Sequence, residues 1–277
     1  MTVSLRIGQI DYANCVPLFR ALQTECPSDH YSYVRGVPAT LNRLLARGEI
    51  DLSPSSSIVY GSDPEHYWLL PGLSISTTGP VKSVLLFSQK PLDQLQGSKI
   101  GLTTESDTSV ALLRIILKRY CGFENVFQRT DQPLTEAFTS FTALLLIGDA
   151  ALRESLRGHV CHVYDLGELW YRFTGHPFVF AIWIANRAAV AGRHADLQGL
   201  ARTLHHAKEI ARTRLISYAA DQPGFDWINK GDLAAYWQTI SYDLGAKQIA
   251  GLKSFFQHAA ELGIIPRCPG LVFFPEC

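Results

Sequence analysis

Apolar residues occur along the chain either in short continuous runs or at helical spacing. Continuous runs at residues 142–147 and 178–185 predict buried strands, and residues 5–10 predict a short first strand. Leucines at helical spacing predict helices in stretches such as residues 38–47 and 110–120. Because strands alternate with helices, we expect βαβ units and mainly parallel sheets in an α/β fold.

Two predicted strands, residues 81–88 and 178–185, bracket a central block of the chain. A block of roughly one hundred residues is large enough to form an inserted lobe. We therefore predict a discontinuous first lobe, residues 1–80 plus 186–277, and an inserted second lobe, residues 81–185. The two bracketing strands would cross between the lobes, beside an interlobe cleft of the kind in which small ligands bind.

Composition excludes several classes of protein. The 277 residues are 47% hydrophobic and 18% charged, and 25 basic side chains balance 25 acidic ones. A formal net charge of zero argues against nucleic acid or an anionic membrane as the partner. The first residues do not resemble a signal peptide, and no apolar run is long enough to span a membrane. We expect a cytoplasmic protein, and the sequence leaves its oligomeric state open.

Motifs for cofactors, metals and common nucleophiles are missing from the sequence. It contains no Walker loop, no G-x-G-x-x-G after a strand and no G-x-S-x-G. The six cysteines are widely spaced, so we expect reduced thiols and no zinc site. Cys15 stands near a helix start, where it is either an activated nucleophile or a small buried residue. We expect no cofactor.

Short polar residues follow four predicted strands, at residues 5–10, 50–53, 98–102 and 142–147. They are Asn14; Ser55, Ser56 and Ser57; Ser106, Thr108 and Ser109; and Gly148 with Asp149. The carboxyl ends of strands form the binding edge of open α/β sheets, and helix starts there attract carboxylates or phosphates. The same residue types are ordinary helix N-caps, so each position has a purely structural interpretation as well.

The stretch STTGPVKSVLLFS, residues 76–88, carries Lys82 and Ser83 into an apolar strand directly after a Gly-Pro turn. Buried lysine is rare unless it is paired. If this strand is the first crossing between the lobes, both side chains lie where the chain passes the cleft. A ligand then explains their polarity better than folding does, and Ser83 is the stronger candidate.

Several stretches together resemble the chorismate dehydratase family of the futalosine route to menaquinone. They are IDYANCVPL, GVPATLNRLLARGEIDLSPSSSIVY, LPGLSISTTGPVKSVLLFS, LTTESDTSVALLRIIL, LLLIGDAAL and YDLGELWYRFTGHPFVFAIW. They occur in family order, and the region that they span is about two thirds of the chain. The resemblance implies a fold like the type 2 periplasmic binding proteins, which agrees with the two lobes inferred from the pattern.

The resemblance also implies a reaction and a set of residues. Chorismate would lose water and become aromatic, which needs no redox cofactor or metal. Asn14 and Ser83 match positions expected to act on the substrate. Ser55 and Ser56 lie in the matching serine junction, and Thr108 with Ser109 in the next; such junctions would bind carboxylates. Asp149 would cap its helix or polarise a bound group, and Lys82 would neutralise a carboxylate or pair with an acid.

The proton acceptor is not evident in the matched stretches. They contain no histidine at the four junctions, and His162 and His176 lie beside later elements. The enolpyruvyl carboxylate of the substrate is therefore one candidate base. Two alternatives remain open: 1,4-dihydroxy-6-naphthoate synthase of the same route, which shares the fold, and a non-catalytic solute-binding protein, which would carry an export signal.

Overall fold

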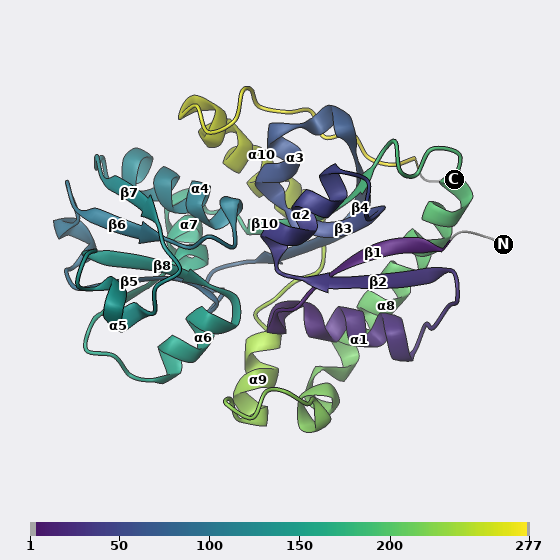
Figure 1. Ribbon diagram of the computed structural model, residues 1–277, viewed down its shortest axis with the longest axis horizontal. Helices are drawn as coiled ribbons and strands as arrows, with labels where there is room; N and C mark the ends of the chain where they lie inside the picture. Colours follow the sequence, from purple (N-terminus) through teal and green to yellow (C-terminus); the bar gives the residue numbers. More distant parts are fainter. Residues whose placement is uncertain (1–3, 276–277) are drawn as a thin grey trace.

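Two five-stranded sheets organise residues 4–275, the part of the chain that the computed structural model describes. Figure 1 shows them in separate lobes, one around β5 to β9 and the other around β1 to β4 and β10. The two-lobed α/β fold predicted from the sequence is confirmed. No helix within the described range is both long enough and apolar enough to cross a membrane.

The first sheet has the strand order β2-β1-β3-β10-β4. Its strands are β1 (Leu5–Ile10), β2 (Tyr31–Gly36), β3 (Leu52–Ser56), β4 (Tyr67–Thr77) and β10 (Phe178–Asn186). β1 runs parallel to β2 and β3, whereas β10 runs antiparallel to β3 and β4. Every residue of β3 is buried, and all but one of β10 are, because helices cover both faces of the sheet there.

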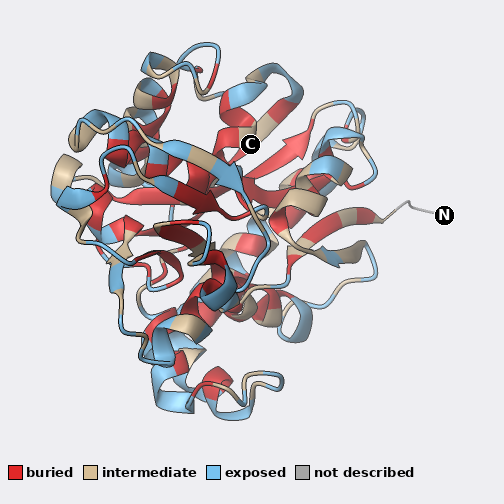
Figure 2. Ribbon diagram, turned by 60° about the vertical axis from the view of Figure 1, so that its left-hand side comes forward, coloured by how far each residue is buried: buried red, intermediate tan, exposed pale blue. Residues whose placement is uncertain are grey.

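The second sheet has the order β7-β6-β8-β5-β9. Its strands are β5 (Val84–Ser88), β6 (Lys99–Leu102), β7 (Val126–Arg129), β8 (Ala143–Ile147) and β9 (His162–Asp165). β6 runs parallel to β7 and β8, and β5 runs antiparallel to β8 and β9. Figure 2 shows the central strands of both sheets as buried and the outer faces of the helices as exposed, whereas the edge strands β2, β7 and β9 contain no buried residue.

The expectation of mainly parallel sheets is wrong for half of each sheet. Only the β2-β1-β3 and β7-β6-β8 parts consist of parallel neighbours. Parallel neighbours arise where a helix returns the chain to the same edge, and such βαβ units build these two halves. β5 and β10 enter their sheets after the chain has crossed from the other lobe, without such a return, and they pair antiparallel.

Two predicted boundaries differ from the structure. The strand expected from residue 81 begins only at Val84, because the preceding backbone turns at Lys82, whose φ of +63° lies in the left-handed region. We placed residues 178–185 in the second lobe, whereas β10 pairs with β3 and β4 of the first sheet. The exact limits of the two lobes stay a prediction.

The helices predicted near residues 38–47 and 110–120 are confirmed, whereas the sequence pattern did not predict α5 and α9. The helices are α1 (Val16–Thr24), α2 (Pro38–Ala46), α3 (Ser57–Ser62), α4 (Asp107–Ile115), α5 (Leu134–Ala137), α6 (Gly148–Leu156), α7 (Leu166–Thr174), α8 (His194–Asp221), α9 (Lys230–Trp237) and α10 (Ala246–Glu261). Short turns of 3-10 or π type, Ala13–Cys15 (η1), Pro64–His66 (η2), Leu92–Gln94 (η3) and Ile116–Tyr120 (η4), complete the order.

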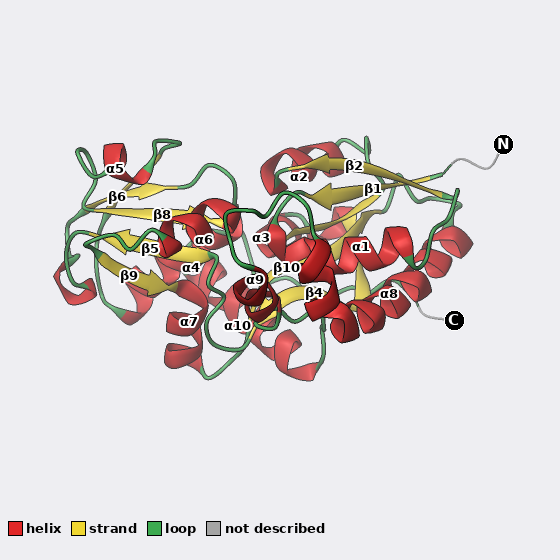
Figure 3. Cartoon of the chain, turned by 90° about the horizontal axis from the view of Figure 1, so that it is seen from below, coloured by secondary structure: helices red, strands yellow, loops and turns green. Residues whose placement is uncertain are grey.

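The C-terminal helices bind the two lobes to each other. α9 packs against α8, and α10 packs against β10 of the first sheet and α4 of the second lobe. Figure 3 shows α9 and α10 near the middle of the long axis of the molecule. The aromatic side chains of Tyr236, Trp237 and Phe255 in these helices are buried. This segment therefore stabilises the junction at which the candidate site lies.

Candidate active site between the lobes

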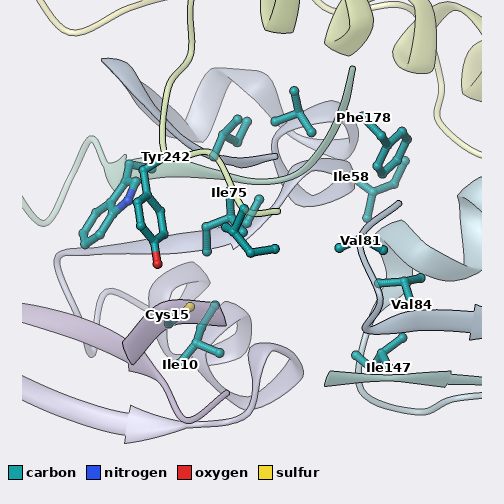
Figure 4. Packing of buried hydrophobic residues seen from close by; sticks show 14 of the residues in the cluster. Ile10, Cys15, Ile58, Ile75, Val81, Val84, Ile147, Phe178 and Tyr242 are labelled. Atoms are coloured by element: carbon teal, nitrogen blue, oxygen red, sulfur yellow. The ribbon is translucent and has the colours of Figure 1, made fainter. Parts of the chain in front are cut away.

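A pocket lies at the junction of the two lobes. Its lining consists of Ile10, Tyr12, Asn14, Pro38, Ser56, Ile75, Val81, Ser83, Val84, Ser106, Ser109, Ile147, Gly148, Phe180 and Ala181. Figure 4 shows Ile10 and Ile75 from the first lobe and Val84 and Ile147 from the second on different sides of this region. Apolar walls with a few polar groups are typical of small-molecule sites.

Asn14 lies in the 3-10 turn η1 and lines the pocket. The prediction that it caps the first helix is wrong, because η1 comes first and Cys15 occupies the N-cap position of α1 without a side-chain bond. The Oδ1 atom of Asn14 is buried and has no hydrogen-bond partner among the described residues. A buried amide oxygen is normally paired, so its side chain is free to accept a bond from a ligand.

Ser83 lies directly before β5 and is 2% exposed. Its Oγ accepts a 2.8 Å hydrogen bond from the hydroxyl of Tyr236, and its carbonyl accepts one from the N–H of Gly148. The turn that presents Ser83 is held by Asp165, whose carboxylate accepts bonds from the N–H groups of Val81 and Lys82. Ser83 and Asn14 therefore line the same pocket.

Three serines at helix starts complete the polar lining. Ser56 occupies the N-cap position of α3, and its side chain makes no capping bond. Ser106 caps α4, because its Oγ accepts a bond from the N–H of Ser109, and the two hydroxyls lie 3.1 Å apart. The starts of α4 and α6 add the partial positive charge of a helix N-terminus, which favours a bound anion.

The other candidate residues lie outside the pocket lining. Ser55 is on β3 next to Ser56, where its side chain faces the opposite side of the sheet, and its Oγ has no hydrogen-bond partner among the described residues. Lys82 is exposed. Thr108 is buried and accepts a bond from the N–H of Ile58. Asp149 follows Gly148 on α6.

Asp149 neither caps its helix nor reaches the pocket wall. Ile147 holds the N-cap position of α6, and the Asp149 Oδ1 accepts a 2.9 Å bond from the N–H of Ala13 in the first lobe. Tyr12 donates a similar bond across the junction to Glu105. Together with the Thr108 bond to Ile58, these contacts hold the lobes together around the pocket. Asp149 and Thr108 therefore link the two lobes, because each accepts a hydrogen bond from a backbone N–H of the first lobe.

The lining of the pocket carries no charged side chain among the described residues. Among the described residues that line it, none is Lys, Arg, His, Asp or Glu, and Tyr12 is the one phenol. Burial and the bond to Glu105 raise the pKa of Tyr12, so its hydroxyl keeps its proton at neutral pH. Burial likewise raises the pKa of the Cys15 thiol, which is 1% exposed and so fits the packing role better than the nucleophilic one.

We found no metal centre: within residues 4–275, no three His, Cys, Asp or Glu side chains lie close enough together to hold an ion. The cysteines described by the structure, Cys15, Cys26, Cys121, Cys161 and Cys268, are free thiols, and Cys277 lies outside the described residues. His162 and His176 do not line the pocket. The site therefore offers neutral hydrogen-bond donors and acceptors.

The pH dependence of stability should report on Asp149. Burial raises the pKa of its carboxyl, against the bond from Ala13, so ionisation is more costly in the folded state than in the unfolded chain. Its stabilising effect is complete below the ordinary aspartate pKa and is lost as the pH rises through the raised value. Asp149→Asn keeps an acceptor for Ala13. Urea titrations at several pH values measure the effect. We expect the free energy of unfolding of Asp149→Asn, minus that of the wild type, to increase with pH across this window. A difference that stays constant with pH would refute the raised pKa of Asp149.

Sequence reasoning missed several groups at the site. Tyr12 and Phe180 line the pocket, and Tyr236 contacts Ser83 from behind. Tyr12 lay in the IDYANC stretch, so its place beside Asn14 was a usable signal. Tyr236 gave no local signal, since its spacing suits helix packing equally well.

Two lobes with mixed sheets and a pocket between them define the fold class of the type 2 periplasmic binding proteins. The structure matches the periplasmic aliphatic sulphonate binding protein SsuA from Escherichia coli with a TM-score of 0.69 at 17% identity, covering 97% of this chain and 90% of that one. It matches the alkanesulfonate-binding protein SsuA from Xanthomonas axonopodis pv. citri, bound to MOPS, with a TM-score of 0.66 at 17% identity, covering 98% and 96%. These likenesses show the fold.

The chain belongs to the menaquinone biosynthesis family, whose model matches residues 5–261. It is 33% identical over 285 residues to a chorismate dehydratase from Thermus thermophilus, covering 98% of each chain. The family resemblance seen in the sequence is therefore confirmed.

Proposed function

We propose that the protein is a chorismate dehydratase, which eliminates water from chorismate to give 3-[(1-carboxyvinyl)oxy]benzoate in menaquinone biosynthesis by the futalosine route. The observation that carries the proposal is the meeting of Asn14 and Ser83 with the serines of two helix starts in one interlobe pocket. Membership of the menaquinone biosynthesis family and the name of the Thermus relative support it.

The reaction needs a proton to leave C3 and a hydroxide to leave C4 of the chorismate ring. The C3–H electron pair forms the new C3–C4 double bond, the C4–O bond breaks, and the proton joins the hydroxide as water. Because C3 is conjugated with the ring carboxylate through a double bond, negative charge that develops at C3 spreads onto that group. Donors placed at the ring carboxylate therefore stabilise the developing charge.

The chain's own polar groups fit this requirement without a cation. Ser56 at the start of α3 and Ser109 in the first turn of α4 would each hold a carboxylate of the dianionic substrate. Asn14 and Ser83 would then lie beside the reacting carbons, where their amide and hydroxyl orient the leaving group. The apolar wall of Ile75, Val84 and Ile147 would exclude water from the ring.

The base in this scheme is the enolpyruvyl carboxylate of the substrate. The pocket lining supports that choice, since Tyr12 is its one ionisable side chain among the described residues and burial raises the pKa of that phenol. Asp149, the nearest alternative, is engaged by Ala13. We expect Asp149→Asn to lower kcat less than about tenfold, whereas loss of a general base costs about 10²–10⁴-fold. A loss of that larger size with unchanged chorismate binding would contradict substrate assistance.

Turnover of chorismate by the purified protein tests the proposal. We expect an aromatic product to form in proportion to the chorismate consumed, followed by absorbance and mass. Tight binding of another solute without turnover would instead favour a solute-binding protein. Conversion of a naphthalene precursor in place of chorismate would favour 1,4-dihydroxy-6-naphthoate synthase, which no histidine in the described pocket lining supports.

A further inference from the structure

The two candidate catalytic residues are both held by one C-terminal segment, residues 236–242. Tyr236 donates a 2.8 Å hydrogen bond to the Oγ of Ser83. Trp237 donates through Nε1 to the carbonyl of Ala13, at 2.8 Å, and Tyr242 donates through its hydroxyl to the carbonyl of Asn14, at 2.7 Å. Figure 4 shows the ring of Tyr242 with its hydroxyl directed toward the turn that contains Cys15.

Each of these aromatic side chains is buried and lies outside the pocket lining. Tyr236 is 2% exposed, Trp237 1% and Tyr242 6%. They therefore reach a bound molecule only through Ser83 and the Ala13–Cys15 turn. Packing alone does not require three aromatic side chains to donate hydrogen bonds to Ser83 and to the Ala13–Cys15 turn. Their donors are buried, and a buried donor is costly unless it is paired.

The bond from Tyr236 determines how the Ser83 hydroxyl is used. A serine hydroxyl has one proton to donate, and it rotates to suit its partners. When Tyr236 donates, Ser83 accepts with a lone pair and its own proton is directed elsewhere. The one protein acceptor in reach among the described residues is the carbonyl of Val81 at 3.4 Å, which is at the limit of a hydrogen bond. The Ser83 proton is thus available to a ligand in the pocket.

Ionisation does not disturb this arrangement. Burial raises the pKa of Tyr236 far above its ordinary value, and the bond to Ser83 lowers it by less. Tyr236 therefore keeps its proton at neutral pH. The charges of Asp149 and Asp165 raise the pKa of Tyr236 further, so they oppose loss of its proton.

We propose that Tyr236 is a positioning residue that directs the Ser83 hydroxyl into the pocket, and that Tyr242 and Trp237 fix the turn carrying Asn14. The inference rests on the proposed function, because it concerns how these two residues act on the substrate. It extends the site to a segment far from Ser83 in the chain, since the Tyr236 bond spans 153 positions. The C-terminal helices then serve catalysis as well as stability.

A double-mutant cycle in kcat and KM tests the inference with chorismate as the substrate. Tyr236→Phe keeps the ring and removes the donor, so we expect kcat to fall about five- to tenfold with KM changed less than about twofold. In a Ser83→Ala background the same change should alter kcat less than about twofold, because there is no hydroxyl left to direct. Tyr242→Phe, combined with Asn14→Ala, provides a second cycle if Tyr236→Phe does not fold.

The control is Tyr120→Phe. Tyr120 on η4 shares a 2.9 Å hydrogen bond with His258 of α10, so it also links the second lobe to the C-terminal helices, but it does not line the pocket. We expect this variant to keep kcat and to change only the melting temperature. If Tyr236→Phe keeps kcat as Tyr120→Phe does, Tyr236 is structural and the inference is wrong. The same conclusion follows if Tyr236→Phe lowers kcat as much in the Ser83→Ala background as in the wild type.

The result also separates this inference from the proposed function. A wild-type protein that does not dehydrate chorismate overturns the proposed function, and the inference falls with it. A wild type that turns over, with activity lost in Ser83→Ala but unaffected in Tyr236→Phe, overturns the inference alone. Retained activity in Ser83→Ala likewise overturns it, since Ser83 would then have no catalytic role to position.

Discussion

Replacing Ser83 with alanine is expected to lower kcat for chorismate by about 10²–10³-fold, the cost typical of removing one donor from a site of developing charge. The hydroxyl of Ser83 is the one that Tyr236 leaves free to donate into the pocket. Removal takes away a bond made to the reacting group, so KM should change much less than kcat. Steady-state kinetics with a chorismate-dependent absorbance change measures both.

Ser88→Ala is the matched control for this experiment. Ser88 is the last residue of β5, the strand that begins directly after Ser83. It is fully buried, donates a 2.6 Å bond to the carbonyl of Lys90, and does not line the pocket. Its loss should lower stability by about 1 kcal/mol and leave kcat within a few-fold. Equal effects of the two serines on kcat would show that Ser83 matters through folding and not through catalysis.

Gly251→Ala is expected to destabilise the protein by about 3 kcal/mol, at the upper end of overpacking effects. Gly251 lies in α10, and a Cβ there would stand 2.1 Å from the carbonyl oxygen of Pro177, one residue before β10. The obstructing atom belongs to the backbone, so no side-chain rotation relieves the contact. Either α10 or the start of the crossing strand must move.

Gly199→Ala provides the comparison within another helix. Gly199 lies in α8, where an added Cβ meets no atom within 4 Å. Alanine is the better helix former by about 1 kcal/mol, so this variant should be slightly more stable than the wild type. Urea unfolding of both variants measures the difference. A neutral Gly251→Ala would mean that α10 does not pack closely against the crossing strand.

The sequence pattern predicted the elements of the fold well, because strand and helix periodicity is a local property. The alternation of short apolar runs with helically spaced leucines, for example, anticipated β8 and α4. The antiparallel entry of β5 and β10 was not predictable in this way. It depends on where the chain crosses between lobes, which no local pattern records.

The candidate site was predictable in part for a similar reason. Serine and asparagine after a strand indicate either a helix cap or a ligand contact, and only the structure separates the two. Ser106 caps its helix, and Thr108 accepts a hydrogen bond from the other lobe. The Oδ1 atom of Asn14 has no partner among the described residues. The partner of Ser83 comes from α9, which carries no recognisable motif. Contacts between distant parts of the chain decide these roles.

A crystal structure of the protein with 3-[(1-carboxyvinyl)oxy]benzoate bound tests most directly whether the interlobe pocket is the site of the reaction. We expect one carboxylate beside Ser56 at the start of α3 and the other beside Ser109 on α4. The ring should lie against Ile75 and Ile147, and Ser83 should donate to the product. Product bound outside this pocket, or bound within it with neither carboxylate at a helix start, would contradict the assignment of the interlobe pocket as the site of the reaction.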